Sequence, residues 1–154
     1  MCGIVGYIGS KPASSIIVKG LRRLEYRGYD SAGISTIEEG DFYTSKCKGK
    51  INDLENLRSM ANHSSTSGIG HTRWATHGEP NVNNAHPHHD EGKVFSLIHN
   101  GIIENHYSIK EYLIQKGVVF SSDTDTEVLV QFIGYLYNTK KRPAIKCRPF
   151  DELL

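Results

Sequence analysis

The chain opens with the stretch MCGIVGYIG, residues 1–9, in which a cysteine directly precedes an apolar run. Residues 3–9 form a short apolar run that is bounded by glycines and followed by Lys11-Pro12. A run of this length between turn residues is typical of a buried strand. The stretch therefore predicts a strand at the start of the fold, with Cys2 at its mouth.

Helical and strand patterns alternate along the rest of the chain. Ile17, Leu21 and Leu24 recur at helical spacing and predict an amphipathic helix over residues 13–26. A β-hairpin is expected over residues 32–47. The other expected elements are strands at 68–75, 94–99 and 118–121, and helices whose capping boxes start at Asn52, Ser108 and Thr124. This irregular alternation, with several antiparallel strands, predicts the α+β class without fixing the topology.

The composition limits the classes of function. With 154 residues, of which 38% are hydrophobic and 23% charged, the chain fits one folded domain. The net charge of +1 gives no electrostatic case for a nucleic acid or a membrane, so a polyanionic partner would need a local patch. No stretch resembles a membrane helix or a signal peptide, which predicts a cytoplasmic protein. Three widely spaced cysteines argue against a disulfide framework and a structural zinc site.

Cys2 is the first candidate for chemistry. Removal of Met1 places a thiol and a free α-amine on one residue, and the pKa of such an amine is about 7.7–8.0. The amine can activate the thiol as a general base and later protonate a leaving amine. The alternative is a small buried hydrophobic residue beside a strand, because free cysteines more often pack than react.

Two further motifs carry donors for a small polar ligand. In His99-Asn100-Gly101, the Asn amide and the Gly N–H can face a developing oxyanion, although Asn-Gly is also a strong hairpin signal. Within residues 71–78, the Arg73 guanidinium suits a carboxylate and Trp74 can cover a ligand. The alternative for this segment is a strand end with a surface arginine and a core tryptophan.

Acidic and histidine-rich segments complete the candidates. Residues 123–127 can pair with an ammonium group, although acidic residues at a helix start are also ordinary caps. The segment His86-Pro87-His88-His89-Asp90 is dense in metal-binding atoms, but without a ligand partner elsewhere a solvated loop is favoured. A histidine-rich metal-binding module is therefore a third, weaker alternative for the function.

Five motifs, taken in order, resemble one family. They are MCGIVG (1–6), LEYRGYDSAGI (24–34), HTRWATHG (71–78), HNGIIENH (99–106) and TDTE (124–127). Together they resemble the glutaminase region of the glucosamine-6-phosphate synthase family, within the class II glutamine amidotransferases. The resemblance covers roughly residues 1–137.

The resemblance implies an α+β fold, a four-layer αββα sandwich of the N-terminal nucleophile hydrolase type, and hydrolysis of L-glutamine without a cofactor or a metal. It implies Cys2 as the nucleophile with its own α-amine as base, and Asn100 and Gly101 as the oxyanion hole. Arg73 would bind the α-carboxylate of glutamine and Asp125 its α-ammonium group. The other implied site residues are the pocket-lining Trp74, Thr76 and His77, and Arg27, which positions the nucleophile less directly.

The resemblance also sets expectations about partners and missing parts. The ammonia would be used to make glucosamine 6-phosphate from fructose 6-phosphate. The sugar-phosphate isomerase domain that carries out this step would be missing here or supplied by a second chain. We expect a partial glutaminase domain over residues 1–137, incomplete at its C-terminus, and a basic irregular tail over residues 138–154. Uncovered strand edges of such a domain favour aggregation, a homo-oligomer or another chain as cover. The alternative to an enzyme is an inactive fragment or an interaction subunit.

Overall fold

The computed structural model describes residues 2–57, 64–74 and 79–140. At its centre lies an antiparallel four-stranded sheet with the strand order β1-β4-β2-β3. Its strands are β1 (Gly3–Ile8), β2 (Ser31–Glu38), β3 (Asp41–Lys48) and β4 (Ser67–Arg73). The predicted opening strand and the predicted hairpin are both confirmed, and the opening strand pairs with β4 rather than with the hairpin.

The register of the sheet brings the start of β1 next to the end of β4. Gly3 lies opposite Thr72, and the Gly3 N–H donates to the Thr72 Oγ1 atom at 3.2 Å. A larger residue would not fit at Gly3, because its Cβ would lie 2.7 Å from the Cβ of Leu24. Cys2 is therefore held at the end of the sheet at which β4 finishes.

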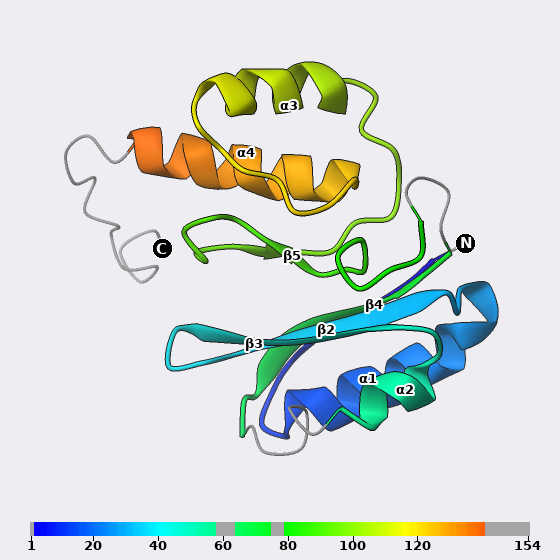
Figure 1. Ribbon diagram of the computed structural model, residues 1–154. Coiled ribbons are helices and arrows are strands. Elements are labelled where there is room, and N and C mark those ends of the chain that lie inside the picture. The colour runs from blue at the N-terminus through cyan, green and yellow to red at the C-terminus, as the bar shows by residue number, and fades with distance from the viewer. Residues whose placement is uncertain (1, 58–63, 75–78, 141–154) are drawn as a thin grey trace, which may run out of the picture.

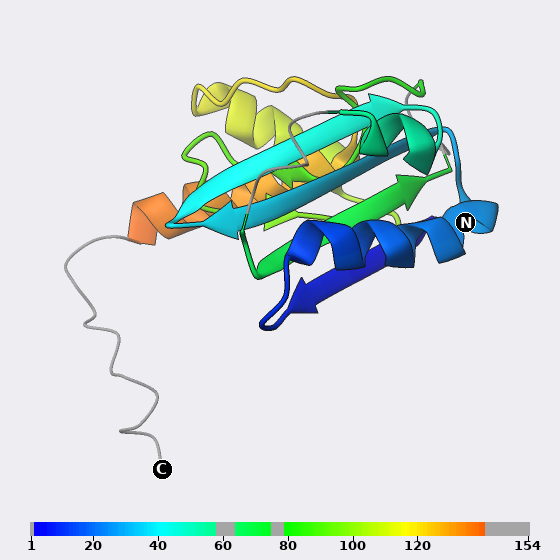
Figure 2. The same cartoon turned by 90° about the horizontal axis from the view of Figure 1, so that it is seen from below.

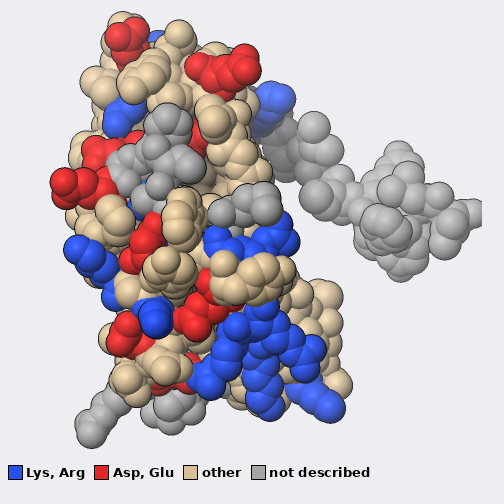
Figure 3. Space-filling model, turned by 90° about the vertical axis from the view of Figure 1, so that its right-hand side faces the viewer, with Lys and Arg blue, Asp and Glu red and all other residues tan. Residues whose placement is uncertain are grey.

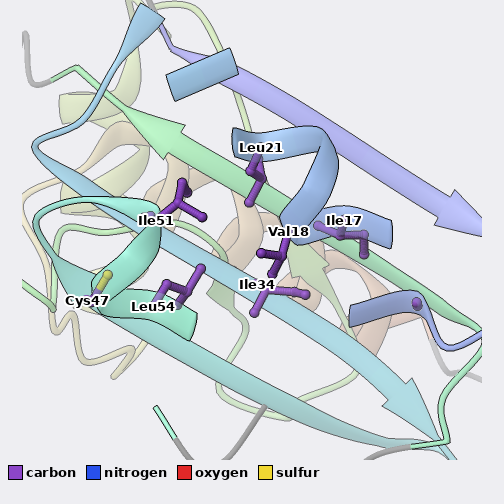
Figure 4. Close-up of a cluster of buried hydrophobic side chains, with 9 residues drawn as sticks. Ile17, Val18, Leu21, Ile34, Cys47, Ile51 and Leu54 are labelled. Carbon is purple, nitrogen blue, oxygen red and sulfur yellow. The ribbon is translucent and has the colours of Figure 1, made fainter. Parts of the chain in front are cut away.

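Two helices cover one face of this sheet (Figure 1). They are α1 (Ala13–Leu24), which continues into the 3-10 turn η1 (Glu25–Arg27), and α2 (Ile51–Glu55). Seen from below, α1 lies over β1 and β4, and α2 lies over the hairpin of β2 and β3 (Figure 2). The buried side chains between helices and sheet are labelled in Figure 4: Ile17, Val18, Leu21, Ile34, Cys47, Ile51 and Leu54. Burying each of the larger aliphatic side chains contributes about 1.5–3 kcal/mol.

The opposite face is covered by a second sheet and two further helices (Figure 1). These elements are β5 (His88–His89), β6 (Ser96–Leu97), α3 (His106–Gln115) and α4 (Asp125–Lys140). The layers follow in the order helices, sheet, sheet, helices, which confirms the α+β class and the αββα arrangement. Of the tail expected over residues 138–154, residues 138–140 continue α4 and residues 141–154 lie outside the described residues.

Side-chain hydrogen bonds shorten the strands of the second half. The strand expected over residues 94–99 is limited to β6, because the Val94 and Phe95 N–H groups donate to the Asp90 Oδ1 atom at 2.8 and 2.6 Å. A strand was expected over residues 118–121, but none forms there. The N–H at the end of that segment, on Ser121, instead donates to a Glu127 carboxylate oxygen at 2.9 Å.

Two of the three expected helix starts are displaced. The α2 helix begins one residue before Asn52, and α3 begins two residues before Ser108. At α2 the Asp53 carboxylate acts as the cap, accepting the N–H of the residue before the helix at 2.9 Å. The third start is confirmed, because the Thr124 Oγ1 atom accepts the Glu127 N–H at 3.2 Å immediately before α4.

Positive charge gathers on one part of the surface despite the balanced total. Figure 3 views the side on which β1 begins, and Lys and Arg side chains cluster in its lower part, over the layer of α1 and α2. Arg22 in this layer pairs with Glu55 and donates to the Asn52 Oδ1 atom at 3.2 Å, which ties α1 to α2. None of the helices in the described ranges combines the length and the apolarity that crossing a bilayer requires.

Candidate active site

One pocket gathers most of the residues that the sequence singled out. Its volume is about 600 Å³, and it lies where the ends of β1 and β4 meet the loop after β6 and the start of α4. Seven of the nine candidate residues line it: Cys2, Arg27, Arg73, Trp74, Asn100, Gly101 and Asp125. The other two, Thr76 and His77, lie outside the described residues. Segments from the first strand to the last helix therefore converge on one cavity.

The Cys2 thiol is half-buried at the mouth of β1. Its Sγ atom lies 3.3 Å from the Trp74 backbone nitrogen, which donates to it, and 3.7 Å from the Trp74 carbonyl oxygen. The alternative interpretation of Cys2, a residue packed into the core, does not hold, because its thiol lines the pocket.

Asn100 and Gly101 lie beside Cys2. The Asn100 Nδ2 atom donates to the Cys2 carbonyl oxygen at 3.3 Å, and the Asn100 Oδ1 atom lies 2.9 Å from the Nε2 atom of His71. The backbone φ of Gly101 is +153°, and a Cβ there would lie 2.8 Å from the His99 Nε2 atom, so this position requires glycine. The pair does not join two strands as a hairpin turn, since it follows β6 and leads to α3.

Arg73 is the last residue of β4, and its side chain is buried in the pocket wall. Its Nη1 atom donates to the Glu79 carbonyl oxygen at 3.4 Å. Gly28 passes so close to this strand end that a Cβ would lie 2.8 Å from the Arg73 carbonyl carbon. Trp74 is 45% exposed and its ring meets Tyr29 edge to face at 5.4 Å, so Trp74 is a wall of the pocket and not a core residue.

Asp125 is an acidic residue of the same pocket lining as Arg73. It is the first residue of α4, and its Oδ2 atom accepts the Ile103 N–H at 2.8 Å. This bond ties the loop that carries Asn100 to the start of α4. A buried guanidinium and a carboxylate in one pocket match a ligand that carries both a carboxylate and an ammonium group.

The histidine-rich segment is buried and does not form the solvated loop that was expected. His86, His88 and Asp90 are buried between the two sheets and α4. The His88 Nε2 atom lies 2.9 Å from the Thr124 Oγ1 atom, and Asp90 is engaged by backbone N–H groups. In residues 2–57, 64–74 and 79–140, no three His, Cys, Asp or Glu side chains are grouped to hold a metal ion.

Six lining residues were not among the site candidates, and two of them, His71 and His86, are buried histidines. His71 belongs to the motif at residues 71–78 but was assigned no function there. Strand periodicity would have identified it as a residue that faces the pocket. Residues two apart on a strand share a face, so a pocket-facing Arg73 places His71 on the same side. Burial, the largest cause, lowers the pKa of His71 from 6.5 to about 4 and also lowers that of His86, so both rings are neutral near pH 7.

Comparisons with known proteins agree with this geometry. A model of the glutamine amidotransferase domain family matches residues 58–138, just over half of the chain. The glutamine-fructose-6-phosphate aminotransferase (isomerizing) of Bacteroides thetaiotaomicron is 56% identical over 142 residues, which are 92% of this chain and 23% of that protein. The chain therefore spans about a quarter of the length of the curated relatives it matches.

Two solved structures share the fold. The glutamine phosphoribosylpyrophosphate amidotransferase of B. subtilis, in complex with ADP and GMP, aligns with a TM-score of 0.73 at 28% identity. The alignment covers 87% of this chain and 29% of that one. A structure described as the allosteric regulatory enzyme of purine biosynthesis aligns with a TM-score of 0.76 at 26% identity, over 94% of this chain and 30% of that one. Family model, relatives and fold agree with one another, and the chain belongs to the glutamine amidotransferase family.

Proposed function

We propose that this chain hydrolyses the side-chain amide of L-glutamine and releases ammonia, with Cys2 as the nucleophile. The observation that carries the proposal is the single pocket of about 600 Å³ that Cys2 shares with Arg73, Asn100, Gly101 and Asp125. Hydrolysis of a carboxamide needs a nucleophile, donors for the oxyanion and anchors that orient the substrate. Each of these parts has a residue of the right chemistry in this pocket.

The substrate is bound at its two charged ends. Arg73 takes the α-carboxylate through its guanidinium fork, and Asp125 takes the α-ammonium group. The carboxamide at the other end of the side chain then lies at the Cys2 thiol. Trp74 covers the substrate, and Arg27 positions the nucleophile. Thr76 and His77, on the segment that follows Trp74, complete the proposed binding site.

The proposed chemistry begins after Met1 has been removed, which turns the Cys2 nitrogen from an amide into an amine. This amine accepts the thiol proton, and the Cys2 sulfur attacks the carboxamide carbon. The carbonyl oxygen becomes an oxyanion held by the Asn100 Nδ2 and Gly101 N–H groups. The protonated amine then passes its proton to the leaving nitrogen, the C–N bond breaks, and ammonia departs. Water hydrolyses the resulting thioester to glutamate and restores the thiol.

The acceptor of the ammonia is proposed from the relatives. The names of the most similar ones specify fructose 6-phosphate and an isomerising aminotransferase, while this chain spans 22–23% of their length. We assign the glutaminase domain to the chain up to the end of α4 at residue 140, three residues beyond the expected boundary, and a tail to the residues after it. The sugar-phosphate region that consumes the ammonia would be supplied by a longer form of this chain or by a second chain, within a homo-oligomer or another assembly.

Glutamate release from L-glutamine by the purified chain tests the proposal, with the intact mass of each preparation establishing that Met1 is absent. Cys2→Ala should abolish release, and Asn100→Ala should lower kcat by about 10²–10³-fold. Cys47→Ala, which removes a buried thiol that does not line the pocket, is the matched control and should retain activity. Activity that survives in Cys2→Ala would contradict the mechanism. Absence of activity in a folded chain that lacks Met1 would favour the inactive fragment or interaction subunit.

A further inference from the structure

Three buried histidines form a stack between the central sheet and the second half of the fold. The rings of His71 and His86 lie 4.3 Å apart with 25° between their planes, and His86 meets His88 edge to face at 4.9 Å. Their exposed fractions are 1%, 6% and 3%. The chemistry proposed above uses none of them, so their burial next to the pocket needs another explanation.

The hydrogen bonds of Asn100 fix which way its amide points. The Cys2 carbonyl oxygen can only accept, so the Asn100 atom 3.3 Å from it is the NH₂ nitrogen. The Asn100 carbonyl oxygen must then face the His71 Nε2 atom at 2.9 Å, and that nitrogen must carry the proton. His71 thus donates to Asn100, and one of the two Asn100 N–H bonds remains for the pocket.

The other two histidines hold neighbouring backbone and side chains in the same way. The His86 Nδ1 atom accepts the His99 N–H at 3.4 Å, so it fixes the residue before Asn100. The His88 Nε2 atom bonds to the Thr124 Oγ1 atom at 2.9 Å, next to the start of α4. Each ring of the stack therefore contacts a segment that lines the pocket.

We propose that His71 is a positioning residue, which orients the Asn100 amide so that its N–H points at the developing oxyanion, and that His86 holds the adjoining backbone. This inference rests on the proposed glutamine hydrolysis. Without the His71 donor, only the 3.3 Å bond to the Cys2 carbonyl oxygen opposes a half-turn of the amide, which would aim the Asn100 carbonyl oxygen at the oxyanion. The lost hydrogen bond would raise the free energy of the transition state and hardly affect substrate binding, because the carboxamide oxygen of the bound substrate carries little charge.

A neutral ring suits this task. A neutral imidazole with its proton on Nε2 donates one bond and brings no net charge to the pocket. Burial holds the pKa of His71 near 4, and the neighbouring Arg73 charge acts in the same direction. The ring therefore keeps one protonation state over the whole range in which an α-amine near pKa 8 can act as a base.

Variants at His71 separate positioning from stability. His71→Phe fills the site without a donor, and His71→Gln restores an N–H donor at a similar reach. His89→Phe is the matched control, since it removes a histidine of the same layer that bonds to Thr44 and does not line the pocket. We expect His71→Phe to lower kcat by about 10²–10³-fold with KM for glutamine unchanged, and His71→Gln to recover most of the loss. His89→Phe should change only thermal stability.

Inhibitor affinities distinguish a positioning role of His71 from a purely structural one. The aldehyde analogue of glutamine adds the Cys2 sulfur to its carbonyl carbon and places its oxygen at the oxyanion position, whereas glutamate binds without that bond. His71→Phe should weaken the aldehyde by the same factor as kcat and leave the glutamate affinity unchanged. Equal losses for both inhibitors, or kcat unchanged in folded His71→Phe, would overturn the proposal.

A spectroscopic measurement decides the case if the parent chain is inactive or His71→Phe does not fold. Nitrogen-15 NMR of the parent chain should show His71 neutral with its proton on Nε2 between pH 5.5 and 8. A proton on Nδ1 would refute the positioning inference directly. An inactive parent chain with the Nε2–H form present would instead count against the proposed function alone.

Discussion

Lowering the pH from 7 to 5 should remove much of the stability of this fold, because His71, His86 and His88 are buried as neutral rings. Burial is the largest cause of each shift. It lowers the pKa of His71 from 6.5 to about 4 and that of His88 to about 2, and it also lowers the pKa of His86. The positive charges of Arg73 and Lys46 act in the same direction on His86 and His88.

The sign and size of the effect follow from proton binding. Below about pH 6.5 the unfolded chain takes up a proton at each of the three positions, while the folded chain does not until far lower pH. The unfolded state is therefore favoured as the pH falls. Each histidine lowers the free energy of unfolding by about 0.2 kcal/mol at pH 7 and about 2 kcal/mol at pH 5. Three lower it by about 6 kcal/mol at pH 5, against a total of about 5–15 kcal/mol for an ordinary domain.

Urea unfolding followed by circular dichroism at pH 7, 6, 5.5 and 5 measures this loss. Between pH 5 and 6, the slope of the free energy of unfolding should correspond to the uptake of close to three protons by these rings, and His89, whose pKa burial also lowers, adds to it. His88→Gln can still hydrogen-bond to Thr124 and should lower the uptake by about one proton. Thr124→Val breaks the same bond without removing a titrating group, so it should lower stability while the slope stays that of the parent chain. Equal slopes in the parent chain and His88→Gln would refute the reasoning.

Packing and thiol reactivity give two further predictions. Gly33→Ala would place a Cβ 2.1 Å from the His86 carbonyl oxygen and should lower the free energy of unfolding by roughly 1–3 kcal/mol in a urea titration. A variant as stable as the parent would contradict the close spacing of the two sheets. In a folded Cys147→Ser background, iodoacetamide should modify Cys2 and spare Cys47, because burial raises the pKa of Cys47 to about 11. Peptide mass mapping measures the two rates, and equal rates would count against the burial of Cys47.

Local sequence patterns predicted much of the first half of the fold, because the spacing of apolar residues within each segment is enough to form its helix or strand. The helical spacing of Ile17 and Leu21 matches α1, and the apolar run after Cys2 matches β1. Exact helix starts were harder, since several polar residues near each start can act as a cap. At α2 the carboxylate of Asp53 is the cap, although Asn52 had the expected pattern.

The second layer could not be predicted in the same way, because distant residues create its environment. A segment rich in His and Pro has the same composition whether it is solvated, binds a metal or is buried. Residues 86–88 are buried because Gly33, on a strand far away in the sequence, has no side chain where the His86 carbonyl oxygen lies. The Asn-Gly pair was ambiguous for a similar reason. His71 and Cys2, remote in sequence, bond to Asn100 and hold the pair in a loop that lines the pocket, not in a hairpin turn.

The two halves of the candidate site belong to different layers, which explains why polar contacts join them. Cys2 and Arg73 lie at the end of the central sheet, whereas Asn100 and Asp125 come from the loop and helix beyond it. The apolar core lies on the other face of that sheet, against α1 and α2. Apolar contacts are non-directional and would allow the two layers to shift relative to each other. Hydrogen bonds such as that of His71 form only at one relative position of the layers. A site that needs its donors within a fraction of an ångström of the nucleophile therefore gains precision from a polar interface, at the cost of stability in acid.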